Sequence, residues 1–319
     1  MLRAMSTRTA VALDPAAAYP EVTALRSALA ARDWAACRAV LDAAEPMART
    51  ELTVLGGEQS DLEAFLREVL RDDPDDGAAA AMLGGHLTTV GWKIRSTVRA
   101  KYVSHEQFAA FHDWLRKADR VLVDGAARNP HDPAIAVARL PTARGLGLGR
   151  SEARRRYDRL AAVDPHHLPG QRHLVQQLCP KWGGSWEEAH AFAREAMLAA
   201  PPGAHNAVLV AEAHIEHCLD LDSDAAARHL RSPDVLGEVY DAARLSVWHP
   251  HFRRSFGWVR VMSTFAMVFS RAGEQTAAGS LFAVLGHFAS EWPWIYLGDP
   301  VAQVRAGRAA AVLPAGASR

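Results

Sequence analysis

Apolar and small residues recur along most of this chain at the spacing of an α-helix. After Ser185, for example, Ala189, Phe192, Ala193 and Ala196 fall on one face of a helix, and that face is expected to be buried. The alternation of polar and apolar positions that is typical of strands is nearly absent. The pattern therefore predicts an all-α protein.

Capping residues mark where several of these helices begin. Ser104 is followed three residues later by Gln107, which is the spacing of a capping box, and Asp132 stands directly before a proline. These signals divide the chain into helices of ordinary length that are joined by loops of a few residues.

Three prolines that end predicted helices recur at intervals of 35 and 36 residues. They are Pro130, Pro165 and Pro201. An alanine stands twelve residues before each of them, where a small side chain lets two helices pack closely. These alanines are Ala118, Ala153 and Ala189. In the central copy, Tyr157 and Leu160 continue the same face, and the register resembles the second helix of a tetratricopeptide repeat.

The match to that family is incomplete, because the first helices of the hairpins depart from it. Pro141 and Arg144 stand where the family has a small residue and an aromatic one. The sequence thus predicts degenerate tetratricopeptide-like hairpins, with direct register over residues 104–202.

The stretch CPKWGGSWEEAH, at residues 179–190, raises a separate question. A Gly-Gly pair and a capping serine explain a tight turn between two helices, and this turn does not require Lys181 or Trp182. A structural role is favoured for both, with the tryptophan closing the turn and the lysine near the negative pole of a helix end, and the alternative is that the pair binds a ligand. With the upstream LGGHLTTVGWKIRSTVRA (residues 83–100), PKWGGS resembles a stretch in bacterial helical-repeat proteins of unassigned function. That resemblance extends over residues 20–220, and it implies a fold and no activity.

The expected organisation is a tetratricopeptide-like helical-hairpin solenoid with a helical C-terminal cap. A flexible N-terminus (1–19) precedes the degenerate repeat hairpins (20–202). A C-terminal helical region (203–312), continuous with the solenoid, and a short tail (313–319) complete the chain.

Composition and charge narrow the function classes. Lys plus Arg and Asp plus Glu number 36 each, so no overall field attracts nucleic acid or an anionic membrane. Three widely separated cysteines, without a CxxC pair, suggest reduced thiols in the cytoplasm and no structural zinc. No signal-peptide pattern opens the sequence, and no apolar run approaches the ~20 residues of a membrane span.

The residue pattern offers no catalytic set. His214 and His217 lie one turn apart and could share a metal, but Glu212 and Glu216 of the same helix point elsewhere. The pair is therefore expected on an exposed or groove-facing surface, without metal. GLGLGR at 145–150 lacks the strand and lysine of a nucleotide loop. No cofactor is predicted, and the sequence favours a non-enzymatic role.

Arginine is concentrated in two places. One run covers residues 150–159, and a second basic stripe on the long helix near Trp92 contains Arg95 and Arg99. Both are interpreted as surfaces that could face the concave side of a solenoid, where such proteins bind extended partners. The leading hypothesis is a protein-interaction module that binds an acidic or carboxylate-bearing peptide in this groove. The residues assigned to partner binding are Trp92, Arg95, Arg99, Lys181, Trp182, His214 and His217.

The alternative hypothesis is an enzyme or small-molecule-binding protein. It would use a pocket formed by the tryptophan- and histidine-rich residues 182–295. Convergence of Trp182, His214, His217 and Trp248 on one cavity would favour it.

Overall fold

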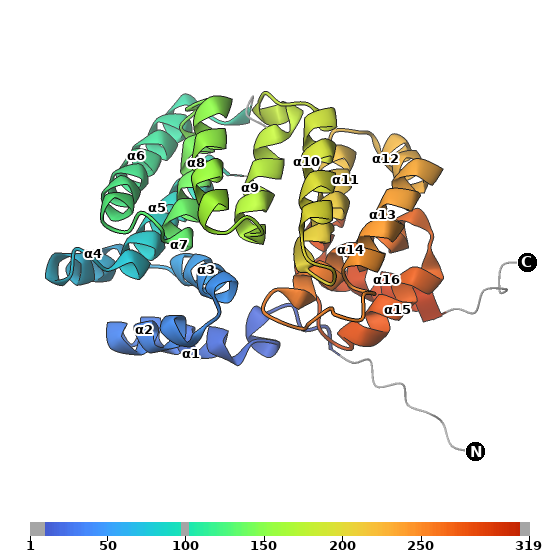
Figure 1. Ribbon diagram of the computed structural model, residues 1–319, viewed down its shortest axis with the longest axis horizontal. Helices are drawn as coiled ribbons and strands as arrows, with labels where there is room; N and C mark the ends of the chain where they lie inside the picture. The colour runs from blue at the N-terminus through green and yellow to red at the C-terminus, as the bar shows by residue number, and fades with distance from the viewer. Residues whose placement is uncertain (1–9, 97–101, 313–319) are drawn as a thin grey trace, which may run out of the picture. The chain divides into compact units, whose positions relative to one another are not determined.

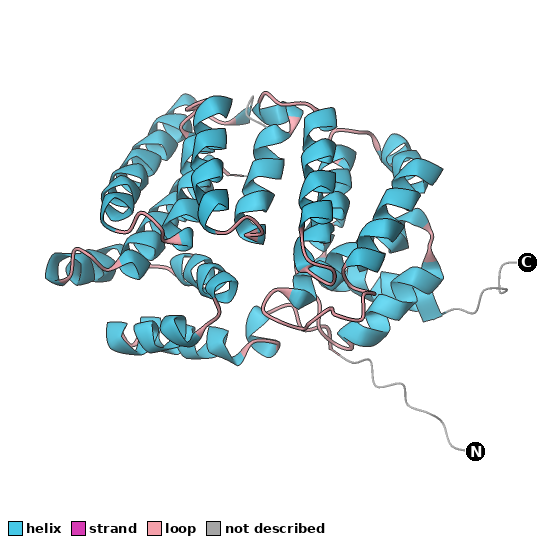
Figure 2. Ribbon diagram, in the orientation of Figure 1, coloured by secondary structure: helices cyan, strands magenta, loops and turns pink. Residues whose placement is uncertain are grey.

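The structure, a computed structural model, describes residues 10–96 and 102–312. Within these ranges the chain forms α-helices, short 3₁₀-helices and loops, and no strand is present (Figures 1 and 2). An isolated β-bridge joins Ala12 to Phe288. The predicted all-α class is confirmed.

Contacts along the backbone divide the chain into two compact units, and each is described by itself. We call Glu21–Ala199 the central unit, and Met1–Pro20 together with Ala200–Arg319 the terminal unit. The helices from the boundary through the central unit are α1 (Pro20–Ala30), α2 (Trp34–Ala43), α3 (Pro46–Gly57), α4 (Glu63–Asp72), α5 (Gly77–Arg95), α6 (His105–Arg128), α7 (Pro133–Gly145), α8 (Arg150–Val163), α9 (Leu168–Leu178) and α10 (Trp186–Ala199).

The core of the central unit forms around α5, which packs against α3, α4, α6 and α7. Small residues in α5 and α6 allow these helices to approach closely. A Cβ added at Gly84 would lie 2.3 Å from Cγ of Leu122, and one at Gly125 would lie 2.8 Å from Cβ of Ala80. Because interiors are close-packed, larger residues at these positions would force the helices apart.

The following helices pack in sequence order, α7 against α8 and α9, and α9 against α10. Ala118 in α6, Ala153 in α8 and Ala189 in α10 are all buried. The recurring alanine of the sequence thus marks a packed position in each of three helices.

The terminal unit is built around α11 and α14. Helix α11 packs against α12, α13 and α14, and α14 also packs against α15 and α16. Its helices are α11 (Val208–Cys218), α12 (Ser223–Arg231), α13 (Pro233–Leu245), α14 (Trp258–Ala272), α15 (Gln275–Leu285) and α16 (Pro300–Val312).

Residues 10–19, which the sequence analysis assigned to a flexible segment, make defined contacts within the terminal unit. Backbone hydrogen bonds pair Ala12 with His287 and Ala289. The Tyr19 hydroxyl accepts the Val259 N–H at 3.1 Å. The expected flexibility of residues 10–19 is therefore corrected, because Ala12 pairs with the loop that follows α15 and Tyr19 bonds to the first turn of α14. Residues 1–9 and the expected tail at 313–319 lie outside the described residues.

One helix was not predicted from the sequence, and a glycine sets the start of another. Helix α3 was not predicted, although Pro46 stands at its first turn. Helix α14 begins at Trp258, after Gly257 in the left-handed region with φ 87°. A residue in that conformation interrupts helical hydrogen bonding before the helix starts.

Candidate functional site

The turn between α9 and α10 explains the glycines of the PKWGGS stretch. After Leu178, a 3₁₀-helix spans Pro180–Trp182, and Gly183 follows in the left-handed region with φ 86°. A Cβ added at Gly184 would lie only 2.0 Å from the Leu178 carbonyl oxygen. The backbone reversal therefore needs glycine at both positions, as the sequence suggested.

Trp182 packs inside the central unit. Its half-buried ring meets Trp92 edge to face with centroids 6.0 Å apart, and the guanidinium of Arg144 lies 5.6 Å from the Trp182 centroid. Arg95 lies 6.0 Å from the Trp92 ring. We call Trp92, Arg95, Arg144 and Trp182 the aromatic corner. Three residues assigned to partner binding from the sequence thus lie together here, with Arg144 in addition.

The other basic residues of that prediction have different positions. Lys181 is exposed beside the aromatic corner. Arg99 lies outside the described residues, so its place in the predicted basic stripe is not described. Within the corner, Nε1 of Trp92 is buried and has no hydrogen-bond partner among the described residues. The contacts of Trp182 are those of a side chain that closes a turn by packing.

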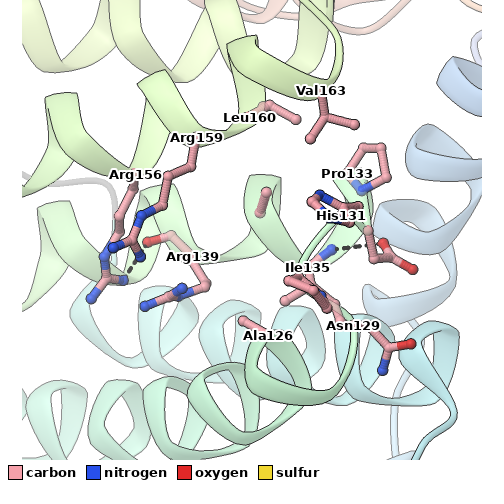
Figure 3. A pocket seen from close by; sticks show the side chains of 13 residues that line it. Ala126, Asn129, His131, Pro133, Ile135, Arg139, Arg156, Arg159, Leu160 and Val163 are labelled. Atoms are coloured by element: carbon pink, nitrogen blue, oxygen red, sulfur yellow. Dashed lines mark hydrogen bonds between the residues drawn. The ribbon is translucent and has the colours of Figure 1, made fainter.

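A pocket of about 190 Å³ lies elsewhere in the central unit. The end of α6, the loop that follows it, the start of α7 and the second half of α8 form its walls. Ile135, Leu160 and Val163 contribute apolar surface. Figure 3 shows Arg139, Arg156 and Arg159 gathered at one side of this space. We call it the arginine pocket.

Arg156 is fully engaged by neighbouring groups. It is 5% exposed, and its guanidinium donates to Asp119 at 3.0 Å and to Glu152 at 2.7 Å. Its Nη1 also donates to the carbonyl oxygen of Arg139 at 2.8 Å. Two carboxylates therefore offset the charge of this residue, and its contacts fix α8 against α6 and α7.

Arg139 and Arg159 differ from Arg156 in this respect. Among the described residues, neither guanidinium forms an ion pair or a hydrogen bond, and Nε of Arg139 is buried without a partner. Burial lowers the pKa of Arg139, and the neighbouring charge of Arg156 lowers this pKa further. The carboxylates of Asp119 and Glu152 act on Arg139 only at longer range and raise its pKa, which opposes the effect of burial. Because a partly buried cation without a directly paired carboxylate is unfavourable, an anion entering the pocket would be stabilised.

A second group of polar side chains lies in the terminal unit. Nδ1 of His214 lies 3.0 Å from Nε2 of His229, and Nε2 of His214 lies 3.2 Å from the carboxylate of Glu238. The His217 ring centroid is 4.4 Å from that of His229. We call these four residues the histidine cluster. They come from three helices, α11, α12 and α13.

The surroundings of His217 and His229 favour neutral imidazoles. Burial, together with the neighbouring His214 and His217, lowers the pKa of His229 to about 4. Burial likewise lowers the pKa of His217. Neutral rings keep a lone pair on one nitrogen, which can accept a hydrogen bond or bind a metal.

The expected exposure of the His214/His217 pair is wrong for His214, which is only 3% exposed. Helices α12 and α13 pack on α11 and cover this residue. The carboxylate of Glu212 points elsewhere, as expected, since it lies 3.9 Å from Nε of Arg260. Sequence reasoning missed His229 and Glu238 because they are 15 and 24 residues from His214, on helices whose packing no spacing shows.

Comparison with protein-family models, curated proteins and solved structures found no match to this chain. Among the described residues, no helix is long and apolar enough to cross a membrane.

Proposed function

We propose that the central unit is a tetratricopeptide-like interaction module that binds an acidic or carboxylate-bearing peptide segment of a protein partner. Its role there is binding, without catalysis. The observation that carries this proposal is the pair of guanidiniums, Arg139 and Arg159, that share one pocket without a carboxylate partner among the described residues.

The chemistry of guanidinium supports a carboxylate as the occupant. Arginine presents several N–H donors in a planar fork that matches the two oxygens of a carboxylate. In the same region, Arg156 donates one hydrogen bond to the carboxylate of Asp119 and one to that of Glu152. A peptide carboxylate would give Arg139 and Arg159 the equivalent interaction.

The size of the arginine pocket supports a small group over a whole metabolite. Its volume of about 190 Å³ lies below the ~300–1,000 Å³ of sites that enclose drug-sized ligands. The space suits one acidic side chain or a chain terminus. Leu160 and Val163 would contact the aliphatic part of that residue.

The carboxylate of Asp132 also lines the pocket, and it is engaged by backbone N–H groups of α7. Oδ1 of Asp132 accepts the N–H groups of Ala134 and Ile135 at 2.8 and 3.2 Å. It therefore caps the N-terminus of α7, whose partial positive charge stabilises it. This capping role leaves Arg139 and Arg159 to a ligand.

An array of short peptides tests the proposal. The full chain is incubated with peptides that carry an acidic residue or a free C-terminus, and with matched neutral and C-terminally amidated peptides. We expect retention of carboxylate-bearing peptides over their neutral matches. Equal retention of both sets would show that the arginine pocket does not select its partner by charge.

A further inference from the structure

The histidine cluster of the terminal unit has a feature that a simple surface pair lacks. His214 is held from both sides, with Glu238 at Nε2 and His229 at Nδ1. A carboxylate at Nε2 keeps the proton on that nitrogen, so the lone pair of His214 lies on Nδ1. That lone pair points toward Nε2 of His229.

This arrangement is the one that metal-binding histidines use. A histidine that binds a metal through one nitrogen almost always donates its other N–H to a carboxylate or carbonyl group, which fixes the ring orientation. We propose that the terminal unit binds a divalent transition-metal ion, with Nδ1 of His214 and Nε2 of His229 as two ligands and Glu238 orienting His214.

The distance between the two nitrogens is compatible with a shared ion. With metal–nitrogen bonds of about 2.0–2.1 Å and tetrahedral angles, two ligand nitrogens lie about 3.3 Å apart. The observed 3.0 Å requires only a small separation of His214 and His229. Both residues are on helices that pack against each other, so the donors are already close before an ion binds.

A third histidine lies near the two proposed ligands, and the site is open enough for an ion to reach it from solvent. His217 lies one turn from His214 on α11, and its ring centroid is 4.4 Å from that of His229, so a third imidazole lies beside the two ligands. His217 and His229 are only half-buried, which leaves the ion a route from solvent. Imidazole ligands favour Zn²⁺, Ni²⁺, Co²⁺ or Cu²⁺ over Mg²⁺ and Ca²⁺.

The competing explanation is a hydrogen-bonded chain, in which His229 donates to His214 and His214 donates to Glu238. It accounts for the same distances without any ion. The two explanations differ in one measurable property, because only a metal site gives saturable binding that depends on His229.

Isothermal titration of the full chain with Zn²⁺, repeated with Ni²⁺, tests the proposal. We expect saturable binding to the wild type and a loss of at least about 100-fold in affinity in His229→Ala. Glu238→Gln, which keeps a hydrogen bond but removes the charge, should lose about 10–100-fold. His214 is less suitable for substitution because it is buried and its loss could unfold the helix packing.

His251→Ala is the matched control. His251 is exposed and lies beside His249 with ring centroids 5.0 Å apart, so it represents adventitious binding by a surface pair. Its substitution should leave the affinity unchanged. If His229→Ala fails to fold by circular dichroism, Glu238→Gln decides the question. No saturable binding, or binding that is undiminished by the deciding variant, would overturn the metal site and leave the hydrogen-bonded chain.

Discussion

At the level of single residues, the buried side chain of His167 connects two helices of the central unit. It is 1% exposed, and its Nδ1 accepts the Gly170 N–H at 3.4 Å at the start of α9. With Nδ1 accepting, the proton is on Nε2, which donates to the Thr50 hydroxyl at 3.2 Å. The same hydroxyl donates to the Pro46 carbonyl. His167 therefore caps α9 and joins it to α3.

This environment predicts an acid-sensitive central unit. Burial lowers the pKa of His167 below its usual value of 6.5, so the unfolded chain takes up a proton at a higher pH than the folded one. The contribution to the free energy of unfolding is complete above about pH 6.5 and is lost as the pH falls below it. Denaturant unfolding between pH 7.5 and 5 measures the slope.

His167→Asn keeps an oxygen that can cap α9 and removes the titrating ring. We expect a smaller pH dependence of stability in this variant than in the wild type. His217 and His229, whose pKa values are also lowered, would supply the slope that remains. Identical slopes for the two proteins would show that His167 is not the group involved.

At the scale of elements, the turn between α9 and α10 was the feature best anticipated from local sequence. The role of Gly183 and Gly184, the Ser185 cap of α10 and the capping box at Ser104 are all confirmed. Such features involve residues a few positions apart, so local spacing predicts them. Helix α3 was missed because Pro46 alone, without a side-chain cap, gives a weak signal.

The close approach at Gly184 gives a prediction for this turn. Gly184→Ala places a methyl group against the Leu178 carbonyl and should destabilise the protein by about 1–3 kcal/mol. Gly85→Ala is the control, since a Cβ at this position in α5 meets nothing within 4 Å and alanine favours helix. Urea unfolding should separate the two variants. Equal stabilities would contradict the strain expected at Gly184.

Urea unfolding also distinguishes the roles of Lys181 and Trp182 in the PKWGGS stretch. Because Trp182 is half-buried against Trp92 and Arg144, Trp182→Ala should cost about 1–3 kcal/mol, below the ~3–5 kcal/mol of a fully buried ring. Lys181→Ala, at an exposed position, should change stability by less than about 0.5 kcal/mol. A free energy of unfolding in urea that is unaffected by Trp182→Ala would show that the ring is not needed for packing.

Lys181 also bears on the proposed function. If peptide binding by the full chain is lost in Lys181→Ala while stability is unchanged, the PKWGGS turn belongs to the binding surface. If binding keeps its wild-type affinity, the motif is a turn only. We expect Trp182 to act in packing and Lys181 to decide between these roles.

At the scale of the whole molecule, helical periodicity predicted the all-α class, but not which helices come together in space. The arginine run at residues 150–159 contains Arg156 and Arg159, yet only packing shows that Arg156 is neutralised and that Arg139 of α7 joins Arg159. His229 and Glu238 likewise reach His214 from separate helices. Long-range partners of this kind depend on tertiary packing, which spacing along one sequence does not contain.

We propose that Arg139 and Arg159 bind a peptide carboxylate. Isothermal titration of the full chain with a carboxylate-bearing peptide selected on the array tests this most directly. Arg139→Ala/Arg159→Ala should weaken binding at least about 10-fold, because the loss of charge-assisted hydrogen bonds costs about 1.5–3 kcal/mol each. Arg154→Ala is the control, since Arg154 lies on the same helix but pairs with Asp158 on the exposed face. We expect Arg154→Ala to bind the peptide with the affinity of the wild type. Wild-type affinity in the double variant, or an equal loss in Arg154→Ala, would contradict it.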